Sequence, residues 1–113
     1  MQDDELLGTH RQELRRGTVV LACLLSLREP GYGYGLLKTL ETAGIASDGN
    51  TVYPLLRRLE ERGLLESEWN TEESRPRKFY RTTKAGEALA TQLLTDVDDL
   101  TASLHALNGR NHR

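Results

Sequence analysis

The chain has 113 residues, 37% of them hydrophobic, and its formal net charge is −2. This length allows one domain with one appended element, and a core this small is marginally stable alone, which favours a second copy that completes it. A single cysteine, Cys23, excludes an internal disulfide. The longest wholly apolar run, Val19 to Leu25, is far shorter than the roughly 20 residues of a membrane span, and the start is acidic and unlike a signal peptide. We therefore expect a cytoplasmic protein without a membrane partner.

The first part of the chain predicts a flexible polar start, residues 1–9, followed by a helix from about His10 to Arg28. Two apolar stripes run along this helix, which indicates two packing partners, the domain core and another surface. One stripe holds Leu14, Thr18, Leu21 and Leu25, and the other holds Val20, Leu24 and Leu27. Glu29-Pro30-Gly31 ends the helix, because proline and glycine together interrupt regular structure. Cys23 is predicted to be a small buried hydrophobe rather than a redox or metal-binding group.

A second, shorter helix is predicted from Leu36 to about Ala43, after the alternating run Tyr32-Gly33-Tyr34-Gly35. Gly44 suits its C-terminal cap. A phosphate-binding loop is excluded for the glycines, since no strand is predicted before them and no Gly-Lys-Ser/Thr follows.

The third helix has the clearest pattern, with an N-cap predicted at Asn50, give or take two residues, and an end at Gly63. Val52, Leu55, Leu56 and Leu59 occupy positions i, i+3, i+4 and i+7, which predicts one buried face. At 100° per residue, the opposite face holds Asn50, Pro54, Arg57 and Glu61, with Tyr53 and Arg58 on its flanks. Planar and small polar side chains of this kind suit base edges and phosphates.

Two strand-like runs follow, Leu64–Trp69 and Arg77–Thr82, joined by a polar connection, and they predict a hairpin. Five cations and no anion occur from Arg75 to Lys84. A helix followed by a hairpin with a basic tip is typical of a winged helix-turn-helix, in which the helix reads DNA and the hairpin contacts phosphates. The predicted fold class is mainly α with a small antiparallel hairpin (α+β).

The last helix is predicted from Lys84 to about Leu107, with Thr83 as its N-cap. Apolar residues recur along it at spacings of 3, 4, 3, 4 and 3, at Ala90, Leu93, Val97, Leu100, Leu104 and Leu107. This heptad spacing is typical of helices that pack together. A helix of about 24 residues is roughly 36 Å long, more than so small a domain covers. We therefore predict three parts after the flexible start: a DNA-binding domain at 10–84, a dimerisation helix at 85–108 and a flexible tail at 109–113.

Several segments between Leu14 and Gly86 together resemble the PadR-like family of bacterial transcriptional regulators, in family order and spacing. They are Leu14-Arg15-Arg16-Gly17-Thr18, Gly33-Tyr34-Gly35-Leu36-Leu37, Thr51-Val52-Tyr53-Pro54-Leu55-Leu56-Arg57-Arg58-Leu59-Glu60, Gly63-Leu64-Leu65, Arg77-Lys78-Phe79-Tyr80-Arg81 and Thr83-Lys84-Ala85-Gly86. The block from Thr51 to Leu59 is the most specific. Two positions depart from the family pattern: Gly35 replaces a larger helix former, and Thr82 replaces an apolar residue.

The resemblance implies a homodimer in which the last helix packs against the partner's first helix, and which represses transcription at palindromic operators. Release by a small molecule or a stress signal is common in the family, so a small-molecule effector is a further expected partner. The single C-terminal helix resembles the small subfamily. Some small members bind flat aromatic drugs between aromatic residues of this helix, but no aromatic residue occurs in the last helix here.

The expected site residues fall into two groups. For double-stranded DNA they are Tyr34, Lys38, Asn50, Thr51, Tyr53, Arg57, Arg75, Arg77 and Lys78, with Asn50 and Arg57 at base edges and Thr51 and Tyr53 at phosphates. For the dimer interface they are Leu14, Leu21, Leu25, Ala90, Leu93, Val97, Leu100, Leu104 and Leu107.

Neither catalysis nor a metal or cofactor is expected. The three histidines, His10, His105 and His112, are far apart, no His-x₃-His or Cys-x₂-Cys spacing occurs, and the acids from Asp96 to Asp99 lack calcium-loop spacing. One alternative is a winged-helix protein-interaction module without DNA binding, which the wing cations argue against. Another is an effector-gated sensor whose ligand sits in an apolar pore of the dimer.

Overall fold

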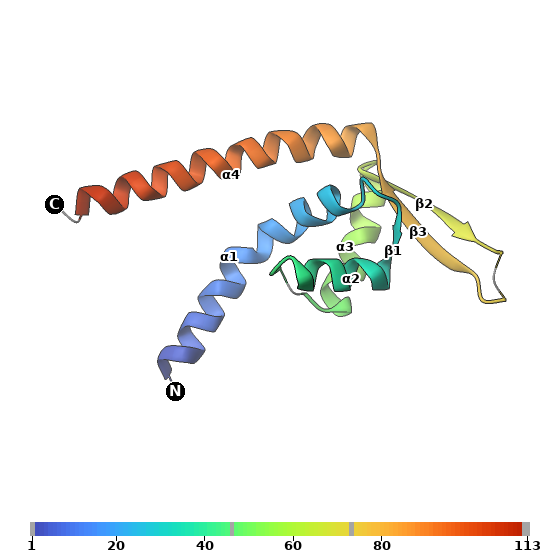
Figure 1. Ribbon diagram of the computed structural model, residues 1–113, viewed down its shortest axis with the longest axis horizontal. Helices are drawn as coiled ribbons and strands as arrows, with labels where there is room; N and C mark the ends of the chain where they lie inside the picture. The colour runs from blue at the N-terminus through green and yellow to red at the C-terminus, as the bar shows by residue number, and fades with distance from the viewer. Residues whose placement is uncertain (1, 46, 73, 112–113) are drawn as a thin grey trace.

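The computed structural model describes residues 2–45, 47–72 and 74–111, which form four helices and one three-stranded sheet. In chain order the elements are α1 (Gln2–Ser26), β1 (Gly31–Tyr32), α2 (Gly33–Thr42), α3 (Gly49–Glu61), β2 (Leu65–Asn70), β3 (Arg77–Thr82) and α4 (Lys84–Asn111). The molecule is elongated, with extents of 62 × 37 × 22 Å. Helix α4 leaves the domain on one side, and the β2–β3 hairpin projects on the other (Figure 1). The predicted fold class is confirmed.

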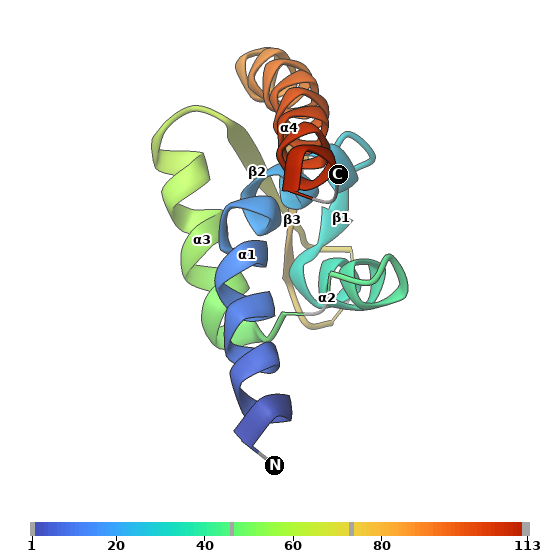
Figure 2. The same ribbon diagram turned by 90° about the vertical axis from the view of Figure 1, so that its left-hand side faces the viewer.

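Helix α1 is longer at its start than the sequence pattern predicts. It begins at Gln2, so the boundary expected near His10 is corrected, and it ends at Ser26 rather than Arg28. Acidic residues fill its first turn, where they interact favourably with the partial positive charge of a helix N-terminus. Residues 3–18 are exposed, and the last turns of the helix, from Val19 onward, are buried or half-buried beside α2 and α3 (Figure 2). Met1, part of the predicted flexible start, lies outside the described residues.

Helix α2 begins earlier than predicted, at Gly33 rather than Leu36. Helix α3 begins within the predicted range: its cap is Asp48, two residues before Asn50, and Asp48 Oδ1 accepts a hydrogen bond from the Thr51 backbone N–H at 3.0 Å. The end of α3 at Gly63 is confirmed: this residue has a φ of 76°, which glycine adopts at little cost.

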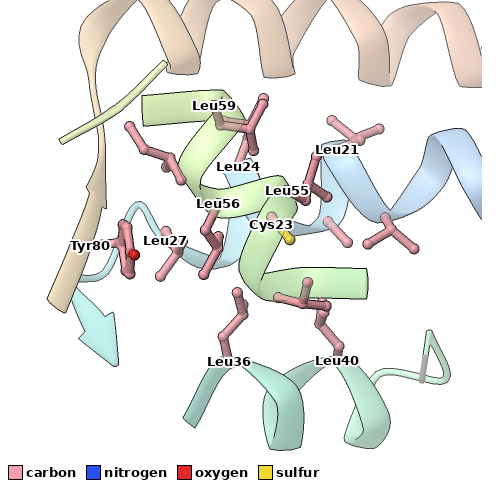
Figure 3. Packing of buried hydrophobic residues seen from close by; sticks show 14 of the residues in the cluster. Leu21, Cys23, Leu24, Leu27, Leu36, Leu40, Leu55, Leu56, Leu59 and Tyr80 are labelled. Carbon is pink, nitrogen blue, oxygen red and sulfur yellow. The ribbon is translucent and has the colours of Figure 1, made fainter. Parts of the chain in front are cut away.

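The core lies between α1, α2 and α3 and is closed by β3 and the start of α4 (Figure 3). The predicted inner face of α3 is fully inside it, at Val52, Leu55, Leu56 and Leu59. Cys23 is buried here, and its burial raises the pKa of the thiol to about 12. At neutral pH the thiol therefore stays protonated and behaves as a small hydrophobe, as predicted.

The sheet has the order β1-β3-β2 and is antiparallel throughout. The hairpin of β2 and β3, here called the wing (residues 65–82), pairs from Leu65 opposite Thr82 out to Asn70 opposite Arg77. Strand β1 was not predicted, because two residues carry no alternation. It pairs only with Phe79 and Tyr80, so within the described residues the outer part of the wing has no third strand beside it.

Thr82, which departs from the family pattern, is buried and hydrogen-bonded. Its Oγ1 donates to the Leu24 carbonyl at 2.6 Å, and its backbone N–H donates to the Leu27 carbonyl at 2.8 Å. The hydroxyl thus joins the wing to α1, and the polar group is satisfied inside the core. Gly86 lies close beside this point, where a Cβ atom would come 2.7 Å from the Thr82 methyl group.

Helix α4 starts at Lys84 as predicted, with the Thr83 hydroxyl accepting a hydrogen bond from the Gly86 backbone N–H at 3.1 Å. It continues to Asn111 rather than ending near Leu107, so residues 109–111 of the predicted tail are helical. Residues 112 and 113 lie outside the described part. The first turns of α4 pack on the domain, and the rest extends away from it (Figure 1). No described helix is long and apolar enough to cross a membrane.

Candidate nucleic-acid interface

The outward face of α3 presents the polar side chains that were predicted to meet DNA. Asn50, Thr51, Tyr53 and Arg57 are all exposed, because the buried leucines turn the other face of the helix into the core. Lys38 is exposed on α2. Pro54 lies near the start of α3, where a missing N–H costs little.

The absence of side chains at two glycines makes room for the Tyr53 ring. A Cβ atom on Gly33, at the start of α2, would lie 2.6 Å from Tyr53 Cε1, and one on Gly49, at the start of α3, would lie 2.7 Å from Cε2. The ring therefore fits between the first residues of both helices, in a gap that only glycine leaves open. Neither glycine has a role that the sequence pattern predicts.

The wing cations differ in what they contact. Arg75 is exposed at the tip. Arg77 donates a hydrogen bond from Nη1 to the Tyr34 hydroxyl at 2.7 Å, and its guanidinium lies 5.3 Å from the centre of the Tyr34 ring. Lys78 instead forms a salt bridge with Glu60 of α3, at 3.4 Å. Lys78 is therefore directed toward the body of the domain.

Arg81, nearer the base of the wing, is also paired. It donates from Nε and Nη2 to one carboxylate oxygen of Glu66 on the neighbouring strand, at 2.9 and 2.6 Å. The hydrogen bonds and the charge of Glu66 raise the pKa of the Arg81 guanidinium, which is charged at any relevant pH. The cationic character of the wing toward solvent thus rests mainly on its tip.

A cleft of about 500 Å³ opens between the start of α2, the flank of α3 and the wing. It brings together five of the predicted DNA-binding residues, Tyr34, Tyr53, Arg75, Arg77 and Lys78, with Tyr32, which was not predicted. Among the described residues no acidic side chain lines it, so the cleft suits an anion beside aromatic rings. The remaining predicted residues, Lys38, Asn50, Thr51 and Arg57, do not line this cleft.

The residues expected at a dimer interface are divided between the core and the surface. Leu21 and Ala90 are buried within the chain itself, at 5% and 1% exposure, so their assignment to a partner is corrected. Leu25 and Leu93 are half-buried against the core. Exposed apolar side chains remain at Leu14, Val97, Leu100, Leu104 and Leu107, and the structure adds Leu6, Leu7 and Leu94.

The chain is similar to known regulators in sequence and structure. Residues 20–92 match the model of the transcriptional regulator PadR-like family. Transcriptional regulator Rv3488 of Mycobacterium tuberculosis (strain ATCC 25618 / H37Rv) is 36% identical over 81 residues, which cover 72% of this chain and 74% of the relative.

Two solved structures extend the comparison. A PadR family transcriptional regulator from Eggerthella lenta DSM 2243 superposes with a TM-score of 0.90 at 45% identity, over 95% of this chain and 96% of that one. Bacillus subtilis PadR in complex with operator DNA shares the fold, with a TM-score of 0.62 at 20% identity, over 67% of this chain and 46% of that one. These relatives are regulators rather than enzymes, as expected for this chain. The chain therefore belongs to the PadR-like family of transcriptional regulators.

Proposed function

We propose that the protein is a homodimeric repressor that binds an inverted-repeat DNA operator through α3 and the wing. The observation that carries the proposal is the shared cleft, where Tyr53 of α3 and the cations of the wing face one another with no acidic side chain among the described lining residues. A DNA duplex is a polyanion, and helix-turn-helix proteins place the second helix of the motif in its major groove. The operator complex of Bacillus subtilis PadR, a protein of the same fold, supports the same use of the fold here.

Within this proposal the residues divide by the part of the DNA that each one contacts. Asn50 and Arg57 are exposed on its outer face and suit base edges, since an arginine fork matches guanine. Thr51 and Tyr53, with Tyr34 and Lys38 of α2, suit the phosphates beside the groove. Arg75 and Arg77 extend the phosphate contacts to the wing.

The second copy is proposed from the exposed apolar side chains. Leu100, Leu104 and Leu107 lie on one stripe of α4 beyond the point where the domain ends, and Leu14 is 77% exposed on α1. Packing of α4 against α1 of a second chain removes both surfaces from water. A dimer of this kind presents two copies of α3, which matches an inverted repeat. A small molecule that alters the spacing of the two copies would release the operator.

The function is tested by selecting binding sequences from a pool of random DNA duplexes. We expect an inverted repeat whose half-sites are about 10 base pairs apart, one helical turn. A protein-interaction module would enrich no sequence at all, and that result would contradict the proposed function.

The wing cations predict a measurable change in salt dependence. Arg75→Ala is expected to flatten the plot of log affinity against log salt by about 0.9 for each phosphate that the side chain neutralises, and by about twice that in a symmetric dimer. Lys78→Ala should change the slope less, because Glu60 already pairs with Lys78. Fluorescence anisotropy of labelled operator over a salt series measures both slopes, with Arg110→Ala at the far end of α4 as the charge-matched control. An unchanged slope for Arg75→Ala would remove Arg75 from the interface.

Substitution of a glycine beside Tyr53 is predicted to weaken DNA binding without unfolding the protein. Gly33→Ala should push the Tyr53 ring out of its gap, since the ring is a movable side chain and Gly33 has no left-handed backbone conformation. We expect about three- to tenfold weaker operator binding, the worth of one hydrogen bond, at a nearly unchanged melting temperature. Gly35→Ala is the matched control on the same helix, since a Cβ atom there meets nothing within 4 Å. Equal affinities for the two variants would show that the ring position is irrelevant to binding.

A further inference from the structure

The outermost pair of the wing ladder is held from outside the hairpin by two tyrosines. Asn70 and Arg77 are the last partners opposite each other before the connection between the strands. Asn70 donates from Nδ2 to the Tyr32 hydroxyl, and Arg77 donates from Nη1 to the Tyr34 hydroxyl, both at 2.7 Å. At this outermost pair, each strand of the wing therefore donates one side-chain hydrogen bond to the segment where β1 meets α2.

The two tyrosines also support each other. Their rings are stacked, with centroids 5.7 Å apart and planes inclined by 13°, and Phe79 of the wing meets the Tyr32 ring edge-on at 6.1 Å. The Arg77 guanidinium lies over the Tyr34 ring, so Tyr34 binds this residue through both its face and its hydroxyl. Aromatic pairs and cation–π contacts each add to the stability of the groups that they join. The two tyrosines, Asn70, Arg77 and Phe79 therefore form one connected set of contacts.

The other contacts between the wing and the rest of the domain lie closer to the base of the wing. Strand β1 ends its pairing at Phe79, and the salt bridge and hydrogen bond of Glu60 reach Lys78 and Ser67, on the inner side of the last pair. A two-stranded hairpin alone is marginally stable in water. The wing projects well away from the helices (Figure 1), so small changes at its base move the tip.

We infer that Tyr32 and Tyr34 act as positioning residues that fix the angle of the wing before DNA arrives. We call these four residues the tyrosine latch (Tyr32, Tyr34, Asn70 and Arg77). Its role in DNA binding rests on the proposed function, whereas its contacts are present in the protein without DNA. A wing already held at its binding angle loses less conformational entropy on association, which strengthens binding.

The chain contains a natural reporter of wing motion. Trp69, next to Asn70, is its single tryptophan and is 63% exposed. We expect the time-resolved anisotropy of Trp69 in the DNA-free protein to show a larger nanosecond depolarisation in Tyr32→Phe and Tyr34→Phe than in the wild type. Tyr80→Phe is the matched control, since it removes a phenol hydroxyl from the wing that takes no part in the latch. The melting temperature of all three variants should stay near that of the wild type.

Operator binding supplies the second half of the test. Tyr32→Phe, at a residue with no proposed DNA contact, should bind the selected operator about three- to tenfold more weakly, as expected for the removal of one hydrogen bond. Tyr34→Phe should lose at least as much affinity, because Tyr34 is also expected at a phosphate. Adding Tyr32→Phe to Asn70→Ala should cost nothing further, because both changes remove the same bond. Additive losses would overturn the pairing that the latch requires.

The outcomes separate the latch from the proposed function. If the nanosecond depolarisation of Trp69 is no larger in the Phe variants than in the wild type, the latch is contradicted, whatever the operator affinities are. If Trp69 motion increases but operator affinity does not fall, the claim that wing angle matters for binding is contradicted. If the wild type itself selects no DNA, the proposed function fails while the Trp69 comparison still decides whether the latch exists.

Discussion

Leu100→Asp is expected to produce folded monomers. Leu100 is 63% exposed on the part of α4 that extends beyond the domain, so the change leaves the core of one chain intact. In the proposed dimer the same side chain is buried, and an unpaired carboxylate there costs several kcal/mol. The dimer dissociation constant should rise by more than about a hundredfold, since each 1.4 kcal/mol is about a factor of ten. Sedimentation equilibrium measures the association, and circular dichroism checks the fold.

The matched control for this change is Ala102→Asp. Ala102 is exposed on the same stretch of α4, and two residues further on it faces nearly the opposite side of the helix. It adds the same charge but should leave the dimer intact. A monomeric wild type, or a dimer that tolerates Leu100→Asp, would contradict the interface proposed for α4.

Arg57→Ala is expected to weaken operator binding by about 1–3 kcal/mol, the worth of a good bidentate contact with a base. Binding to random DNA should weaken less, because phosphate contacts do not depend on sequence. Arg57 is exposed on α3, so the fold should be unaffected. Anisotropy titrations with the selected operator and with a scrambled duplex measure the two changes in affinity.

Arg110→Ala again provides the control for removal of a positive charge, since Arg110 lies at the distal end of α4. It should leave both affinities nearly unchanged. An equal weakening on operator and scrambled DNA in Arg57→Ala would mean that Arg57 only positions the protein on the backbone.

The sequence was sufficient where periodicity decides the structure. The inner face of α3 and the extent of β3 were predicted, because burial follows a repeating pattern that one segment displays by itself. The end of α3 at Gly63 was predicted from the glycine, which also acts within one segment. Periodicity does not say which surface covers an apolar stripe. For that reason the stripes that hold Leu21 and Ala90 were assigned to a partner chain, although both residues are buried in the core of a single chain.

Contacts between distant segments were beyond the reach of the sequence pattern. Tyr32 meets Asn70 across 38 positions, and Tyr34 meets Arg77 across 43, with no local spacing that links them. The alternating Gly-Tyr run by itself suggests at most a phosphate-binding loop, which its flanking residues exclude. The salt bridge of Lys78 with Glu60 is unpredictable for the same reason. Strand β1 is too short to show a pattern, and its pairing depends on the wing that arrives later in the chain.

Hydroxyl-radical footprinting on the DNA upstream of the protein's own gene tests the central claim most directly. The claim is that two chains bind one operator through α3 and the wing. Two chains bound in this way should protect two half-sites related by an inverted repeat, about 10 base pairs apart from centre to centre, with wing protection on the flanking backbone. Protection of one asymmetric half-site by one chain would contradict this claim. The same footprint on a duplex selected from the random pool is the second arm, and an absence of protection there would also contradict the claim.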